Sequence, residues 1–279
     1  MKLKFDMKKR CAFIGAILSL IPFGQPLVIK TGMVLSTTGL IISVHEKAYA
    51  NTADYYIKSG NKKFNQGDVY GALFDYSKAI EIDPEDYNAI NNRGLIKNEL
   101  KDYEGAIADF IKVIEMNPKD DFAYNNRGNS KFYLKDYEGA IADYTKAIEI
   151  NPKYLNAYNN RGNSKYYLKD YEGAIADYTK AIEINPKYLN AINNRGNSKL
   201  ELKNYEGAIA DYTNAIEINP ENSTAYAYRG MAKEMFEKRN FFRHLIFIFN
   251  GDLKGACDDW EKASELGYEE ATNWVKDRC

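Results

Sequence analysis

The feature that most constrains this chain is an internal repeat of 34 residues. Residues 123–156 and 157–190 have the same sequence, except that Phe132 becomes Tyr166. The same frame covers 53–86, 87–120, 121–154, 155–188 and 189–222, and an interrupted sixth copy covers 223–266. A unit this short cannot bury an apolar face by itself, so neighbouring units must complete its core. The sequence therefore predicts a solenoid.

Each copy has the pattern of two helices. In the second helix, Ala140, Ile141, Tyr144 and Ala147 fall on one stripe at helical spacing. This helix is preceded by a residue whose side chain can accept free amide hydrogens, namely Asp102, Asp136, Asp170 or Asn204. It is followed by Pro84, Pro118, Pro152, Pro186 or Pro220, and proline disfavours helix in the residue before it. No long segment alternates with period two, so an all-α fold is predicted.

Six positions recur in the copies, when each copy is numbered from its first residue. They hold a bulky residue at position 4, Gly at 8, Ala at 20, an aromatic residue at 24, Ala at 27 and Pro at 32. The third copy supplies Tyr124, Gly128, Ala140, Tyr144, Ala147 and Pro152, while Val113 departs from the pattern in the second copy. Over about 53–266 the chain resembles the tetratricopeptide repeat family. The resemblance implies a right-handed superhelix of about six hairpins, with the first helices lining a concave groove. Residues 268–279 are predicted to form a helix that caps the last repeat.

Asparagines dominate the predicted groove. Position 6 supplies Asn92, Asn126, Asn160 and Asn194, and position 9 supplies Asn129, Asn163 and Asn197; Tyr133 and Tyr167 lie among them. A carboxamide both donates and accepts hydrogen bonds, so such a column can hold peptide backbone whatever the side chains are. The position-6 column resembles the asparagine ladder of protein O-GlcNAc transferase. An alternative is that these asparagines bond neighbouring helices or face solvent.

Charged residues at two other positions match between the helices. Arg127 and Arg161 stand at position 7, and Asp143 and Asp177 at position 23 of the same copies. An Arg column could bind an anion, but guanidinium is suited to partly buried pairs. We therefore predict internal Arg127–Asp143 and Arg161–Asp177 pairs.

The first fifty residues differ from the rest. Basic residues Lys8, Lys9 and Arg10 precede two apolar runs, 12–23 and 33–44, and the second ends near a small-x-small site at Ala50. Residues 1–50 are predicted to be an export signal cut after Ala50 or a retained membrane anchor, and both would place 51–279 across the plasma membrane. A hydrophobic hairpin would instead leave the repeats on the cytoplasmic side.

Two cysteines fall near the C-terminus. Cys257 and Cys279 lie at similar distances on either side of Gly267, so antiparallel helices would bring them to one level. We predict a disulfide if the domain is exported, and two unpaired cysteines otherwise. The sixth copy also carries an insertion at 237–250 with an apolar run, Phe241 to Phe249, which either forms an exposed lip or extends the preceding helix.

These features predict a protein-interaction scaffold that holds an extended partner segment, with an assembly role in membrane complexes by family analogy. Residues 1–50 hold seven basic and two acidic residues, which leaves 31 basic and 37 acidic ones in the repeats; that balance argues against nucleic-acid binding. No catalytic motif, cofactor site or metal site is predicted. A self-associating structural protein and a non-catalytic subunit that recruits substrates for an enzyme are the alternatives.

Overall fold

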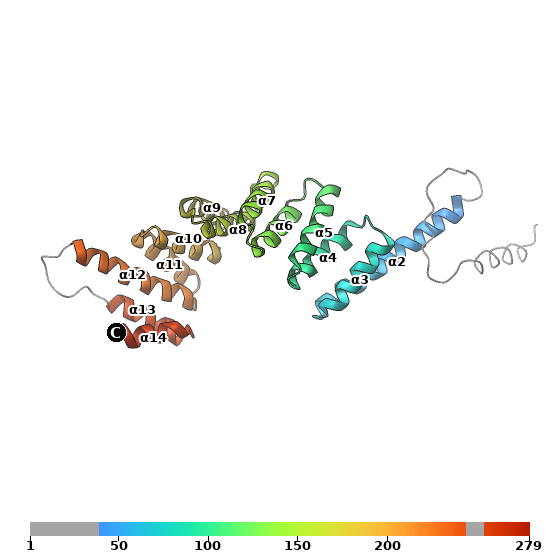
Figure 1. Ribbon diagram of the computed structural model, residues 1–279. Coiled ribbons are helices and arrows are strands. Elements are labelled where there is room, and N and C mark those ends of the chain that lie inside the picture. The colour runs from blue at the N-terminus through green and yellow to red at the C-terminus, as the bar shows by residue number, and fades with distance from the viewer. Residues whose placement is uncertain (1–38, 244–253) are drawn as a thin grey trace, which may run out of the picture. The chain divides into compact units, whose positions relative to one another are not determined.

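The computed structural model describes residues 39–243 and 254–279, and these contain thirteen helices and no strand. The all-α prediction is confirmed for this part of the chain. Two compact units divide the chain, 1–48 and 49–279, and the repeats belong to the second. Within that unit each helix from α3 to α14 packs against the next one along the chain (Figure 1).

The helices occur in pairs of first and second helices. The first helices are α2 (Gly39–Asn65), α4 (Tyr87–Glu99), α6 (Asp121–Tyr133), α8 (Leu155–Tyr167), α10 (Leu189–Glu201) and α12 (Ser223–Arg243). The second helices are α3 (Val69–Ile82), α5 (Tyr103–Met116), α7 (Tyr137–Ile150), α9 (Tyr171–Ile184), α11 (Tyr205–Ile218) and α13 (Lys254–Glu265), and α14 (Glu269–Arg278) follows. From α4 to α12, first helices of adjacent repeats also contact one another, so they form one layer.

The second helices begin at the residues that the sequence indicated. Asp136 accepts a hydrogen bond from the Gly139 amide at 3.0 Å, and Asn204 does the same for Gly207. Helices α5, α7, α9 and α11 are each followed by a C-cap asparagine and then by proline; the asparagines are Asn117, Asn151, Asn185 and Asn219. Boundaries set by local chemistry are therefore the same in the first five copies.

In each hairpin, an aromatic ring of the second helix packs directly on a glycine of the first helix. Tyr144 is 1% exposed, and a Cβ added to Gly128 would lie 2.7 Å from its Cε1 atom. In the sixth repeat Trp260 takes this place over Gly230, again leaving no room for a Cβ. The glycine is required because the two helices approach so closely.

The sixth repeat keeps its pairing despite the insertion. Helix α12 has 21 residues, against 13 in α10, and extends through Phe241 and Phe242. The preceding helix is thus lengthened, while residues 244–253, which hold the rest of the apolar run, lie outside the described residues.

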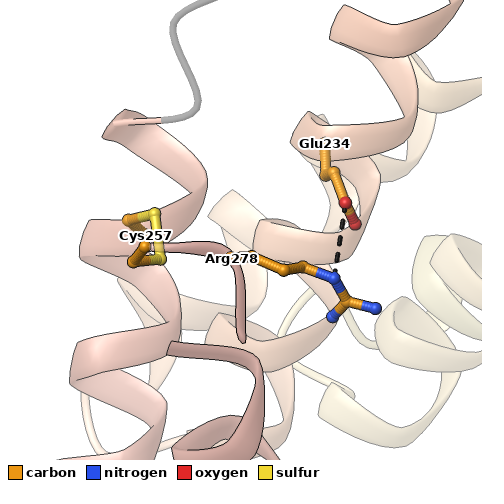
Figure 2. The surroundings of a disulfide bond; sticks show 4 residues. Glu234, Cys257 and Arg278 are labelled. Carbon is orange, nitrogen blue, oxygen red and sulfur yellow. Dashed lines mark ion pairs between the residues drawn. A yellow bond between two sulfur atoms is a disulfide. The ribbon is translucent and has the colours of Figure 1, made fainter. Parts of the chain in front are cut away.

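Helix α14 covers the end of the stack. Its Ala271 is buried beside Trp260, and Cys279 forms a disulfide with Cys257 of α13. Figure 2 shows this disulfide near the ion pair of Arg278 with Glu234 of α12, whose Nε and Oε1 atoms are 3.5 Å apart. The predicted cap is therefore joined to both helices of the last repeat.

In the described part of the chain, no helix combines the length and the apolar character needed to cross a membrane. Residues 1–38, which hold the basic start, the first apolar run and part of the second, lie outside it. The leader and the cleavage site at Ala50 remain predictions.

The turn inside four of the hairpins uses a lysine in the left-handed region. Lys101, Lys135, Lys169 and Lys203 have φ values between 59° and 64°. The first repeat has Gly67 at this position, with φ of 81°. Because a Cβ is disfavoured there, each lysine costs free energy that glycine avoids.

Replacing Lys135 and Lys169 with glycine should therefore stabilise the protein, by roughly 0.5–1 kcal/mol for each substitution. Urea unfolding monitored by circular dichroism measures the change. Lys112→Gly, in the middle of α5, serves as the control and should lose about 1 kcal/mol. A lower midpoint for the Lys135→Gly/Lys169→Gly protein would contradict the expectation.

Candidate peptide-binding groove

Asparagines line an open groove along the first helices. It has a volume of about 590 Å³ and extends over α8, α10 and the start of α12. Eight of its twelve lining residues are asparagines: Asn159, Asn163, Asn190, Asn193, Asn194, Asn197, Asn219 and Asn222. Glu221 is the one charged residue in this lining, so the groove is polar and nearly neutral.

Asn129 and Asn163, at position 9 of the third and fourth repeats, each accept hydrogen bonds from two donors. Tyr144 Oη donates to Asn129 Oδ1 at 2.8 Å, and Asn160 Nδ2 of the next repeat donates to the same oxygen at 3.0 Å. In the following repeat Asn163 Oδ1 accepts from Tyr178 and Asn194, at 2.8 and 3.0 Å. With its oxygen held from two sides, each carboxamide has a fixed orientation.

A free donor remains at position 9 of the third, fourth and fifth repeats. The Nδ2 groups of Asn129, Asn163 and Asn197 have no hydrogen-bond partner among the described residues. Asn163 and Asn197 line the large groove, and Asn129 lines a smaller cavity of about 90 Å³ with Asn160 and Tyr133. Adjacent repeats thus present equivalent N–H donors where a ligand could lie.

Burial keeps the supporting phenols protonated. It raises the pKa of Tyr144, Tyr178 and Tyr212 far above the usual tyrosine value. Each hydroxyl therefore remains a donor to its asparagine at any physiological pH.

The repeats themselves show that the two positions depend on each other. Tyr at position 24 occurs with Asn at position 9 in the first, third, fourth and fifth repeats, as in Tyr76 with Asn61 at 2.6 Å. In the second repeat, Phe110 occurs with Leu95 instead. Where the ring has no hydroxyl, the carboxamide is also absent.

The position-6 asparagines do not form a uniform ladder. Asn160 and Asn194 use Nδ2 to bond the preceding repeat, and Asn92 does so more weakly, at 3.3 Å to Asn61. The Asn126 carboxamide has no partner among the described residues, because Leu95 stands where an acceptor would be. The alternative raised from the sequence was that these asparagines bond neighbouring helices. The Nδ2 atoms of Asn92, Asn160 and Asn194 do so. Their oxygens are not committed to the neighbouring repeat.

The network ends at the sixth repeat, where Tyr228 replaces the position-6 asparagine. As a result, Asn193 has no donor from the next repeat. The equivalent Asn159 accepts from Asn194 at 3.4 Å, whereas Asn193 Oδ1 is buried with no partner in the described part of the chain. This oxygen belongs to a residue that lines the large groove. The groove thus adjoins an unsatisfied acceptor as well as free donors.

The predicted ion pairs are present, with a third member. Arg127 Nη2 lies 2.6 Å from Asp143 Oδ1, and Lys131 Nζ lies 2.8 Å from Oδ2 of the same carboxylate, whose side chain is 5% exposed. Arg161 and Asp177 form the same pair, with Lys165 as the third member. Arg161 Nη1 also donates to Thr145 of the preceding repeat at 3.0 Å. These arginines are occupied within the protein and are not an anion site.

The two tyrosines predicted to lie in the groove are largely solvent-exposed, Tyr133 by 61% and Tyr167 by 58%. Tyr133 lines the smaller cavity, whereas Tyr167 lines neither of the two cavities. Three features were not predicted from the sequence: the lysine of the ion triads, the hydroxyl that bonds each position-9 asparagine, and the unpartnered Asn193. The paired occurrence of Tyr and Asn at positions 24 and 9 could have revealed the second of these.

Family and structure comparisons agree with this geometry. Residues 122–154, 155–188 and 190–222 match one family described as Tetratricopeptide repeat, and residues 87–120 match a second with the same description. The chain belongs to the tetratricopeptide repeat family. No curated protein matches it.

Solved structures share its stacked hairpins. MamA is 24% identical, with a TM-score of 0.57 over 63% of this chain and 96% of that one. PilF of Pseudomonas aeruginosa is 17% identical, with a TM-score of 0.64 over 83% and 100%. YrrB, described as a TPR protein with an unusual peptide-binding site, is 20% identical, with a TM-score of 0.56 over 72% and 97%. At these identities the likeness shows the fold, a tetratricopeptide solenoid.

Asp143→Asn should destabilise the protein by about 3 kcal/mol, because Arg127 and Lys131 would lose the buried carboxylate that pairs with both. Chemical unfolding measures this loss. Glu149→Gln removes an exposed partner of Lys146 and should leave the midpoint nearly unchanged. Equal effects of the two substitutions would refute the structural role given to the triad.

Proposed function

We propose that this protein is an interaction scaffold that holds an extended segment of a partner polypeptide along its asparagine-lined groove. The observation that carries the proposal is that tyrosine hydroxyls donate to the carboxamide oxygens of Asn163 and Asn197. Each Nδ2 group is thereby left without a partner among the described residues, in the lining of the groove. A peptide backbone offers one carbonyl per residue to such donors, whatever its side chains are. The peptide-binding site named for YrrB, which has the same fold, supports this reading.

Periodicity supports a linear ligand. Packed helices lie roughly 8–10 Å apart, and an extended chain advances about 3.3 Å per residue. One asparagine per repeat would thus meet about every third residue of the ligand. Because consecutive repeats have almost the same sequence, the ligand meets the same groups at each step.

A variant that copies the second repeat tests the proposal. Asn163→Leu/Tyr178→Phe and Asn197→Leu/Tyr212→Phe recreate the Leu95 and Phe110 pair, which this fold accommodates. Against peptides selected from a random library on the full chain, the fourfold variant should lose at least about tenfold in affinity, as two hydrogen bonds of roughly 1 kcal/mol are removed. Fluorescence anisotropy measures the loss.

Asp136→Asn is the matched control, because it copies the cap of Asn204 and lies outside the groove lining. It should bind the selected peptides as the unchanged protein does. Undiminished binding by the folded fourfold variant would show that these carboxamides do not hold the ligand, and the proposal would fail.

The disulfide also supports a proposal about the compartment in which the repeats are located. Disulfides persist in oxidising compartments, and Cys257 and Cys279 are joined in the structure. We propose that the repeats are exported or tethered across the plasma membrane by residues 1–50, where they would serve in the assembly of membrane complexes.

Thiol trapping in the native host checks the location. With a maleimide reagent added before lysis, Cys257 and Cys279 should become labelled only after reduction. Cys11 provides the internal reference, since it should react without reduction wherever the leader is retained. Labelling of both C-terminal cysteines before reduction would place the repeats in a reducing compartment and refute this part of the proposal.

A further inference from the structure

Seven aromatic rings form a continuous cluster along the turns of the second to fourth repeats. This tyrosine cluster consists of Tyr103, Phe132, Tyr133, Tyr137, Tyr166, Tyr167 and Tyr171. Tyr103 stacks on Tyr133 with centroids 5.0 Å apart, and Tyr137 stacks on Tyr167 at 5.2 Å. Phe132 contacts Tyr167 at 5.4 Å and so joins two repeats.

The cluster has defined ends. Position 13 holds Tyr133 and Tyr167 in the third and fourth repeats, but Glu99 and Glu201 in the second and fifth. Tyr166 Oη donates to Glu201 at 3.3 Å, and burial together with this carboxylate raises the Tyr166 pKa to about 12. The fold therefore does not need a ring at position 13, since glutamate serves there in two repeats.

Exposure of these rings calls for a ligand. More than half of Tyr133 and Tyr167 is open to solvent, and an exposed patch of contiguous aromatic side chains is typical of an interaction site. Phe132 and Tyr133 line the small cavity together with Asn129 and Asn160. The cluster is thus continuous with the asparagines that present free donors.

The ligand's conformation follows from the spacing. One repeat corresponds to about three ligand residues, so every third residue meets an equivalent ring and an equivalent asparagine. In a β-strand, side chains alternate between faces, so residues three apart point in opposite directions. A polyproline II helix has three residues per turn of about 9 Å and presents every third residue on the same face.

The chemistry of the groove fits the same conformation. Polyproline II has no internal hydrogen bonds, so its carbonyls are free to accept from Asn129 and Asn163. Proline lacks an N–H group but keeps its carbonyl, and its ring packs well in aromatic-lined grooves. The seven rings are uncharged and the one carboxylate bonded to them, Glu201, lies at the end of the cluster, which favours a segment without acidic side chains.

Building on the proposed function, we propose that the tyrosine cluster and Asn129 and Asn163 bind a proline-rich segment in the polyproline II conformation. A proline at every third residue packs against Tyr133 and Tyr167, and carbonyls between them accept from the two asparagines.

Synthetic peptides titrated into the full chain test the inference. The probe repeats Pro-Pro-Ala four times, and the reference repeats Gly-Ser-Ala four times. The proline peptide should bind at least about tenfold more tightly than the reference, because it is already in the bound conformation. Calorimetry or fluorescence anisotropy measures both affinities.

The fold itself supplies matched variants. Tyr133→Glu/Tyr167→Glu copies Glu99 and Glu201, and it should weaken proline-peptide binding at least about tenfold while helicity is retained. Tyr70→Glu removes another exposed ring, 74% accessible on α3, and copies Glu138 at the same position of the third repeat. It should leave the affinity unchanged.

Equal binding of the two peptides, or a doubly substituted protein that binds the proline peptide as before, would overturn the inference. Weak binding of both would overturn it as well. The proposed function would still stand in each case if library-selected peptides bind the groove and lose affinity in the fourfold asparagine variant, so the two failures are distinguishable.

Discussion

Each hairpin depends on one buried carboxylate. Asp143 of the second helix lies between Arg127 and Lys131 of the first, and the same triad recurs in the neighbouring repeats. A carboxylate that is nearly inaccessible requires such partners. The arrangement fixes how the two helices meet, and the arginine of the next repeat, as Arg161 shows with Thr145, extends the contact between repeats.

The hydrogen bonds that join repeats also determine the chemistry of the groove. Tyr144 and Asn160 both donate to Asn129, so an interaction that stabilises the stack also sets which atom of the carboxamide remains free. Binding groups built this way are preorganised, which lowers the entropy lost when a ligand binds. The structure of the stack and the binding that we propose for its groove thus depend on the same contacts.

The departures from the repeat are as informative as the repeat. Leu95 with Phe110 shows that the fold tolerates loss of the Tyr–Asn pair, and Glu99 and Glu201 show that it tolerates loss of the exposed tyrosine. Where repeats keep groups that the fold does not need, a role beyond stability is indicated. Tyr228 leaves Asn193 without a donor among the described residues, in the lining of the large groove.

The sequence alone determined the all-α class, the helix ends and the pairing of Arg127 with Asp143, because these follow from local capping, proline and a strict 34-residue period. It also indicated the Cys257–Cys279 pair from the symmetry about Gly267. It could not determine which asparagines keep an accessible polar atom, since Asn125 and Asn129 differ by one helical turn and are equally polar, yet Asn125 is buried. Only the tertiary structure decided which carboxamide atoms stay free, because the free atom of Asn129 depends on donors from a tyrosine 15 residues away and an asparagine 31 residues away.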